Sequence, residues 1–246
     1  MAACARYPWI CQISVVIVCL FYGVAGNPVS IKTVPFVAWL QSHQHRCAAS
    51  VVHERFLLTA ASCLIDDAGR PINITKALVG TNNLTKGGRL YAIQFFYPHK
   101  KYSMHTGDYN VGLVKLAQKI IFGPKVGPIK LGKRVQVGDL VNVVGWGSDM
   151  KSTGVLQKAT VAVLPADECQ GGLLGRIIGP RMVCAGAAGR GECVGDEGGP
   201  VFVNNTLVAV VSPFRSCGAL PALYTRVASV RRWIRDTIFE NSDIEF

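Results

Sequence analysis

The sequence predicts an all-β protein of two six-stranded antiparallel β-barrels followed by a C-terminal α-helix. Apolar residues occur in short runs separated by Gly, Asn and Pro, which is typical of strands joined by turns. These runs form two sets of six, and helical spacing of apolar residues begins only near the C-terminus. Closed antiparallel barrels accommodate such sets, because closure removes exposed strand edges. The 246 residues suffice for one large all-β domain or two small ones.

Residues 1–25 have the three parts of a secretory signal peptide. Arg6 precedes an apolar run over residues 9–22, and small residues follow over 23–26. An uncleaved membrane anchor is the alternative, but the run is shorter than the ~20 apolar residues that a spanning helix needs. We therefore expect cleavage near Ala25 or Gly26, a secreted protein without a membrane span, and one folded domain over residues 26–246.

The first barrel is expected over about residues 27–123. An irregular lead-in over residues 27–34 precedes six strand candidates. The candidates are residues 36–40, 48–52, 56–59, 74–79, 90–96 and 111–116. Residues 123–133, which begin with Gly-Pro, are the predicted connector to the second half.

The second barrel is expected over about residues 134–228. Its six strand candidates are residues 140–144, 156–164, 182–185, 200–203, 207–211 and 222–227. Asn204 and Asn205 separate two of these runs and predict a hairpin turn.

An amphipathic helix is predicted over residues 229–241, where apolar residues recur at helical spacing. Ser229 is its expected N-cap. The opposite face carries Arg231, Arg232 and Arg235, either as a solvated face or as a binding face.

The chain is basic. Lys and Arg exceed Asp and Glu by 26 to 15, and removing Arg6 with the leader leaves a net charge of +10. Such a charge favours anionic partners, including sulfated glycans, acidic proteins and cell surfaces. Because the basic residues are scattered along the chain, a surface that only maintains solubility is the alternative. We expect no nucleic-acid partner.

Six of the nine cysteines remain once the leader is removed. They are Cys47, Cys63, Cys169, Cys184, Cys193 and Cys217. An even number in an exported chain predicts three disulfides, and six cysteines allow 15 connectivities. A zinc site is the alternative, but the spacings are wide and no Cys-x-x-Cys pair is present.

Residues 195–200, Gly-Asp-Glu-Gly-Gly-Pro, and residues 58–63, Leu-Thr-Ala-Ala-Ser-Cys, resemble motifs of the trypsin-like serine proteases. Residues 195–200 are similar to that family's Gly-Asp-Ser-Gly-Gly-Pro, with Glu197 in the place of the nucleophilic serine. Residues 58–63 are similar to Leu-Thr-Ala-Ala-His-Cys, with Ser62 in the place of the general-base histidine. The first motif also supplies Gly195 and Asp196, which correspond to the loop that forms the oxyanion hole.

Three further motifs extend this resemblance over essentially the mature chain. Residues 110–116 are similar to Asp-Ile-Ala-Leu-Leu-Lys-Leu, with Asn110 in the place of the aspartate that orients the base. Residues 144–147 and 224–227 are similar to landmarks of the family's second barrel. Serine, asparagine and glutamate cannot act as base, charged support and nucleophile, so the resemblance implies an inactive homologue.

The resemblance also implies other features. It implies disulfides that join Cys47 to Cys63, Cys169 to Cys184, and Cys193 to Cys217. It places Gly191 at the floor of the specificity pocket, where no acid then awaits a basic side chain. It also places Ser212 and Phe214 at this pocket, where the phenylalanine replaces a glycine that keeps the mouth open, and its ring either fills or caps the pocket or packs into the nearby loop. Active relatives pair a new amino terminus with the aspartate at Asp196, and no comparable cleavage site precedes residues 23–26. Asp196 therefore has either another cationic partner or a mobile loop.

Three N-glycosylation sequons begin at Asn73, Asn83 and Asn204, each at a predicted loop or turn. His43 and His45 could share one face of a strand, but exposed loop histidines are more common than metal ligands. The family's calcium loop corresponds to residues 80–88, which contain no acid. We expect no metal and no cofactor.

The sequence thus predicts a secreted, catalytically inactive protease homologue that acts by binding. By analogy with similar relatives, it would be a cofactor, decoy or regulator in an extracellular protease cascade, whose protein partner is a protease, an inhibitor or a cascade component, or it would bind an anionic glycan. The alternative is a residual or altered serine-type hydrolase. His99 and His105 are not spaced to replace the missing base.

Overall fold

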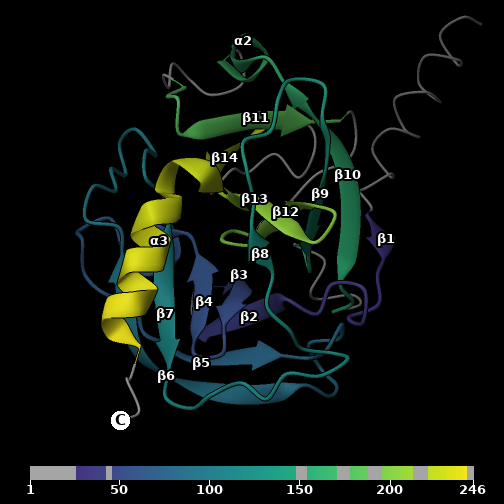
Figure 1. Cartoon of the computed structure of the whole chain (residues 1–246), viewed down its shortest axis with the longest axis vertical. Helices are drawn as coiled ribbons and strands as arrows, with labels where there is room; N and C mark the ends of the chain where they lie inside the picture. The colour runs from purple at the N-terminus through teal and green to yellow at the C-terminus, as the bar shows by residue number, and fades with distance from the viewer. Residues whose placement is uncertain are drawn as a thin grey trace, which may run out of the picture.

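The computed structural model of the 246-residue chain describes residues 26–42, 46–147, 154–170, 178–187, 196–212 and 221–242. Two β-barrels lie one above the other in Figure 1, with a helix along one side. The first barrel closes in the order β2, β3, β4, β7, β6, β5, and every neighbouring pair is antiparallel. Its strands are β2 (Val37–Ser42), β3 (Arg46–His53), β4 (Phe56–Thr59), β5 (Ile74–Val79), β6 (Arg89–Pro98) and β7 (Gly112–Leu116).

The second barrel contains six antiparallel strands in the order β9, β10, β11, β14, β13, β12, and β12 pairs with β9 to close it. Its strands are β9 (Leu140–Gly145), β10 (Gln157–Leu164), β11 (Met182–Gly186), β12 (Pro200–Val203), β13 (Thr206–Val211) and β14 (Ala222–Arg226). The predicted fold class, two six-stranded antiparallel barrels with a C-terminal helix, is confirmed.

Two short strands lie outside these rings. β1 (Asn27–Pro28) pairs with β10, so the predicted irregular lead-in begins as a strand on the second barrel's sheet. β8 (Lys130–Leu131) lies within the predicted connector and runs parallel to β13. A strand of two residues has no alternation of apolar and polar positions to detect, and its pairing partners are remote in sequence.

The C-terminal helix α3 (Val227–Asn241) begins two residues earlier than predicted, and the prediction that Ser229 caps it is wrong. Arg226 is the N-cap, without a side-chain capping bond, because the helix starts directly where β14 ends. The helix packs through buried Val227, Val230 and Ile234, so burial substitutes for a capping side chain. The expected basic face is solvent-exposed. Two further helices are short, η1 (Ala61–Cys63) and α2 (Ala166–Gln170).

Aromatic pairs join the two barrels across a common core. Phe36 packs edge-on against Phe202 at 5.0 Å between ring centroids, and Trp39 packs against Trp146 at 5.6 Å. Each pair joins the first barrel to the second. Both pairs are T-shaped, an arrangement that aromatic rings prefer over a face-to-face stack. The seam between the barrels is therefore tightly packed, which holds residues from both halves in fixed relative positions.

The hairpin turn predicted at Asn204 and Asn205 is present. Asn204 and Asn205 both have positive φ, at 45° and 55°, which the hairpin between β12 and β13 requires.

Two of the implied disulfides, Cys47 with Cys63 and Cys169 with Cys184, are present. The third, between Cys193 and Cys217, lies outside the described residues, as does the predicted signal peptide. Within the described part of the chain, no helix is long and apolar enough to cross a bilayer.

Candidate functional site at the seam between the barrels

Ser62 and Asn110 form a direct pair at one end of the first barrel. Ser62 lies in η1, just beyond β4, and Asn110 lies just ahead of β7, the strand that pairs with β4. The Nδ2 of Asn110 donates a hydrogen bond to the Ser62 Oγ at 3.1 Å, and the backbone N–H of Ser62 donates to the Asn110 Oδ1 at 2.9 Å. Asn110 is buried, so its amide is held by this pair.

The direction of this hydrogen bond limits the chemistry of Ser62. Because Asn110 donates to the hydroxyl oxygen, it does not accept the hydroxyl proton, and a neutral amide has no basicity near pH 7. Ser62 therefore gains no activation as a nucleophile from Asn110. The pair satisfies polar groups without providing a group that can take up a proton.

Glu197 is brought to the same seam by its main chain. Its carbonyl oxygen accepts a hydrogen bond from the backbone N–H of Ala48, on β3, at 2.8 Å. The same oxygen lies 3.5 Å from the Sγ of Cys63, which is disulfide-bonded and so has no proton to donate. Cys63 follows Ser62 in η1, after β4 of the first barrel, and Glu197 lies ahead of β12 of the second, so the Glu197 main chain packs next to the Ser62 segment. The side chain of Glu197 is partly buried.

Asp196 is buried, with 5% of its surface exposed. Its Oδ1 accepts a hydrogen bond from the backbone N–H of Gly147 at 2.7 Å. Gly145 makes room for it, because a Cβ there would lie 1.9 Å from the same oxygen. Asp196 is thus buried against the main chain of Gly147, and the choice between a cationic partner and a mobile loop stays a prediction.

Thr225 connects the second barrel to the Asn110 position. Its Oγ1 donates to the main-chain oxygen of Asn110 at 2.9 Å and lies 3.2 Å from the Oγ of Ser212. The sequence marks Thr225 only as part of a family landmark. No spacing could have revealed this contact, because 115 residues separate the two partners.

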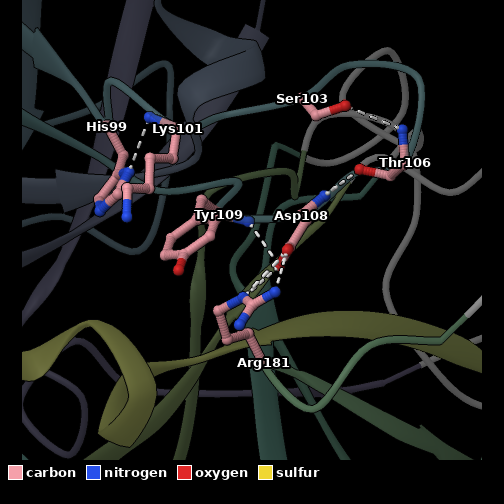
Figure 2. A network of polar contacts seen from close by, with 7 residues as sticks. All are labelled: His99, Lys101, Ser103, Thr106, Asp108, Tyr109 and Arg181. Carbon is pink, nitrogen blue, oxygen red and sulfur yellow. Dashed lines mark hydrogen bonds and ion pairs between the residues drawn. The ribbon is translucent and has the colours of Figure 1, made fainter.

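A polar network holds the residues that precede Asn110 (Figure 2). Arg181 donates from its Nε to both carboxylate oxygens of Asp108, at 2.8 and 2.9 Å, and also pairs through its Nη2. Its guanidinium lies 4.4 Å from the ring centroid of Tyr109, whose φ is +53°. Such a backbone conformation is strained for tyrosine and needs support from its surroundings. The network therefore positions Asn110 from the second barrel.

The ion pair in this network lowers the pKa of Asp108. The hydrogen bonds from Arg181 stabilise the carboxylate, and burial opposes that effect only in part. The sequence did not single out Arg181 or Asp108. They are 73 residues apart, and neither belongs to a recognisable motif.

Two described histidines, His53 and His99, accept hydrogen bonds from nearby backbone N–H groups. His99 stacks on Tyr109 at 4.5 Å between centroids, and its Nδ1 accepts a hydrogen bond from the backbone N–H of Lys101. The Nδ1 of His53 accepts from the backbone N–H of Arg55. Both rings are partly buried, and burial lowers the pKa of each.

These shifted histidines predict a loss of stability in mild acid. The folded state disfavours the charged ring, so the unfolded chain binds protons first as pH falls below ~6.5. We expect the free energy of unfolding to decrease from pH 7.5 to 5, whereas the low pKa of Asp108 adds its own loss only below about pH 4. Urea denaturation across this range measures the slope.

His99→Phe is the matched variant for this prediction, because it keeps an aromatic ring between Tyr109 and Trp233. It should give a flatter slope between pH 7.5 and 5 than the wild type. Some slope should remain because of His53. An unchanged slope in His99→Phe would contradict the assignment to His99.

Several predicted site residues lie outside the described residues. They are His43, His45, Gly191, Cys193, Gly195, Phe214 and Cys217. Among the described residues, no group of three or more His, Cys, Asp or Glu side chains could hold a metal ion. The sequon residues Asn73 and Asn204 are exposed, whereas Asn83 is partly buried and accepts hydrogen bonds from Thr85 at its Oδ1.

The arrangement is that of a serine protease scaffold: two antiparallel barrels, a Ser62–Asn110 pair on the first, and the main chain of Glu197 against Ala48 and Cys63. The sequence pattern described as Trypsin matches residues 24–234, and the chain belongs to the trypsin family.

Curated relatives cover most of the chain. Trypsin 5G1 of Aedes aegypti is 34% identical over 226 residues, which is 87% of this chain and 84% of that protein. Trypsin theta of Drosophila melanogaster is 32% identical, over 86% of this chain and 84% of its own length. Hypodermin-B of Hypoderma lineatum is 31% identical, over 87% of this chain and 86% of its own length. The similarity thus extends over both barrels.

Proposed function

We propose that this member of the trypsin family is a secreted, catalytically inactive homologue that acts by binding. The observation that supports this most directly is the hydrogen bond from the Asn110 amide to the Ser62 hydroxyl. In an active site of this type, a histidine would take the nucleophile's proton and a carboxylate would support the resulting charge. Here one side chain cannot take up a proton and the other carries no charge.

Glu197 supports the same proposal. A carboxylate has no hydroxyl to deprotonate, and its negative charge opposes the oxyanion that forms during acyl transfer. In a comparable protease, loss of the whole triad lowers turnover by ~10⁶-fold, which corresponds to about 8 kcal/mol of barrier. The three replacements together leave no member of the triad in place.

Export is supported by the disulfides. The described residues contain two, and disulfides persist in oxidising compartments outside the cytosol.

The net charge of +10 on the mature chain favours an anionic partner, either an acidic component of an extracellular protease cascade or a sulfated glycan. Heparin chromatography separates these two, because tight glycan binding requires elution at high salt.

An activity assay of the purified mature chain tests the proposal. We expect no hydrolysis of a panel of peptide substrates above background and no labelling by a phosphonate probe for active serines. Ser62→Ala and Glu197→Ala should both leave this baseline unchanged, because neither residue is expected to act as a nucleophile. Turnover at rates typical of trypsins would overturn the proposal, and loss of that turnover in Ser62→Ala would identify Ser62 as a substitute nucleophile.

A further inference from the structure

A cavity of about 570 Å³ lies at one end of the second barrel. Its walls come from β10, β11, the turn ahead of β9, and the junction of β14 with α3, elements that gather in the upper part of Figure 1. The lining residues with a role in the argument are Arg134, Val137, Leu164, Ile178, Met182 and Arg226. This volume is typical of sites for small organic molecules.

Arg226 brings a poorly compensated positive charge to this cavity. Its Nη1 donates to the main-chain oxygen of Val135 at 3.2 Å, and its Nη2 donates to that of Met182 at 3.0 Å. Its Nε is buried and has no hydrogen-bond partner among the described residues. Two neutral carbonyls thus hold a cation that is partly removed from water, which is a costly arrangement without a counter-charge.

Arg134 adds a second positive charge beside the first. Burial lowers the pKa of Arg226, and repulsion from Arg134 lowers it further. The described residues that line the cavity include no Asp and no Glu. Two arginines therefore share one cavity without an acidic side chain in its wall, so an anion there would relieve their repulsion.

Apart from Gln136, the rest of the wall is largely apolar. Leu164, Ile178 and Met182 line it, and Val137 extends it to the surface, where 63% of that side chain is exposed. An anion alone would leave these apolar side chains in contact with water, and an apolar molecule alone would leave the two arginines without a counter-charge. A ligand that carries both parts would satisfy both parts of the wall.

We propose that this cavity binds a small amphiphilic anion. One carboxylate or sulfate head pairs with Arg226 and Arg134, and an apolar body lies along Val137, Leu164 and Met182. A sulfated glycan fits less well, because it carries charge along its whole length and has no apolar part to cover these side chains. The site is separate from Ser62, Asn110 and Glu197, so it does not depend on whether the chain is an enzyme.

Methionine NMR provides a direct test with octanoate as the probe. The chain has four methionines, and Met182 lines the cavity whereas Met104 does not. We expect octanoate to shift the ¹³C-methyl resonance of Met182 and to leave that of Met104 in place. Met182→Leu assigns the resonance. Neither 1-octanol, which lacks the charge, nor inorganic sulfate, which lacks the apolar body, should match the affinity of octanoate.

Two surface variants test the charged contact and the apolar contact separately. Arg134→Gln should weaken octanoate binding by about tenfold, because it removes one charge-assisted contact. Val137→Ser should weaken it by about threefold through lost apolar contact. Both positions are exposed, so the variants should fold. Lys76→Gln, on β5 of the first barrel, removes the same charge from a distant surface and should change nothing.

Several results would overturn the proposal. They are equal binding of octanoate and 1-octanol, equal weakening by Lys76→Gln and Arg134→Gln, or a Met182 resonance that does not respond to octanoate. Displacement of octanoate from this cavity by a heparin hexasaccharide at lower concentration would also overturn it, in favour of a glycan. Proteolytic activity of the chain would contradict the proposed function and leave this site unaffected.

Discussion

The triple variant Ser62→His, Asn110→Asp and Glu197→Ser is expected to react with an active-serine phosphonate probe at least ~10³-fold faster than the wild type. The backbone geometry supports this result, because the Asn110 Oδ1 already accepts the N–H of residue 62 at 2.9 Å. A carboxylate is nearly isosteric with the amide and can keep that bond. Rates of probe labelling, followed by mass spectrometry, measure the effect without requiring a substrate for the specificity pocket.

Partial variants are the controls for this experiment. Glu197→Ser alone should stay unlabelled, since a serine hydroxyl without a neighbouring base is a poor nucleophile. Ser62→His with Asn110→Asp should also stay unlabelled, because Glu197 is not a nucleophile for this probe. Labelling of Glu197→Ser at the rate of the triple variant would show that Ser62 and Asn110 do not cause the expected inactivity.

Gly198→Ala is expected to lower the free energy of unfolding by at least ~3 kcal/mol. Gly198 has a φ of +81°, and a Cβ there would lie 2.0 Å from the Thr59 Oγ1 and 2.5 Å from the main-chain oxygen of Ala48. Thr59 donates to that same oxygen at 2.8 Å, so neither atom can move away freely. Urea denaturation at pH 7.5 measures the change.

Gly69→Ala is the matched control, because Gly69 has a similar φ of +73° and a Cβ there would meet nothing within 4 Å. It isolates the backbone strain, which we expect to cost about 1 kcal/mol. The excess in Gly198→Ala then measures the close approach of the 196–199 segment to the first barrel. Equal losses in the two variants would mean that the segment readily moves away from Ala48.

The strands could be predicted because each barrel buries a regular set of apolar side chains. β4, β5 and β12 begin and end at the residues that the pattern predicts, and β5 and β12 are each bounded by Asn and Gly. β6 extends one residue before and two residues beyond its predicted run, since pairing with a neighbour extends a strand past its apolar residues, whereas β10 begins one residue later than predicted.

The residues around Asn110 could be predicted only in part. The family resemblance implied neighbouring roles for Ser62 and Asn110, and the structure places them in hydrogen-bond contact. The support that Arg181 gives to Asp108, and that Thr225 gives to the main chain of Asn110, was not predicted. These contacts join segments that are remote in sequence, and neither apolar periodicity nor the identity of a single polar residue predicts which partner it will bind.

From the sequence by itself came the strand pattern, the disulfide partners through a family resemblance, and the identities of residues 62, 110 and 197. Those are local properties, because periodicity, motif order and side-chain chemistry can be read without knowing which segments meet. Only the tertiary structure decided that an amide donates to Ser62, that Asp196 is buried against Gly147, and that Arg134 and Arg226 share a cavity. Closing two barrels and packing them together brings remote residues within a few ångströms, and the chain's local preferences do not specify those distances.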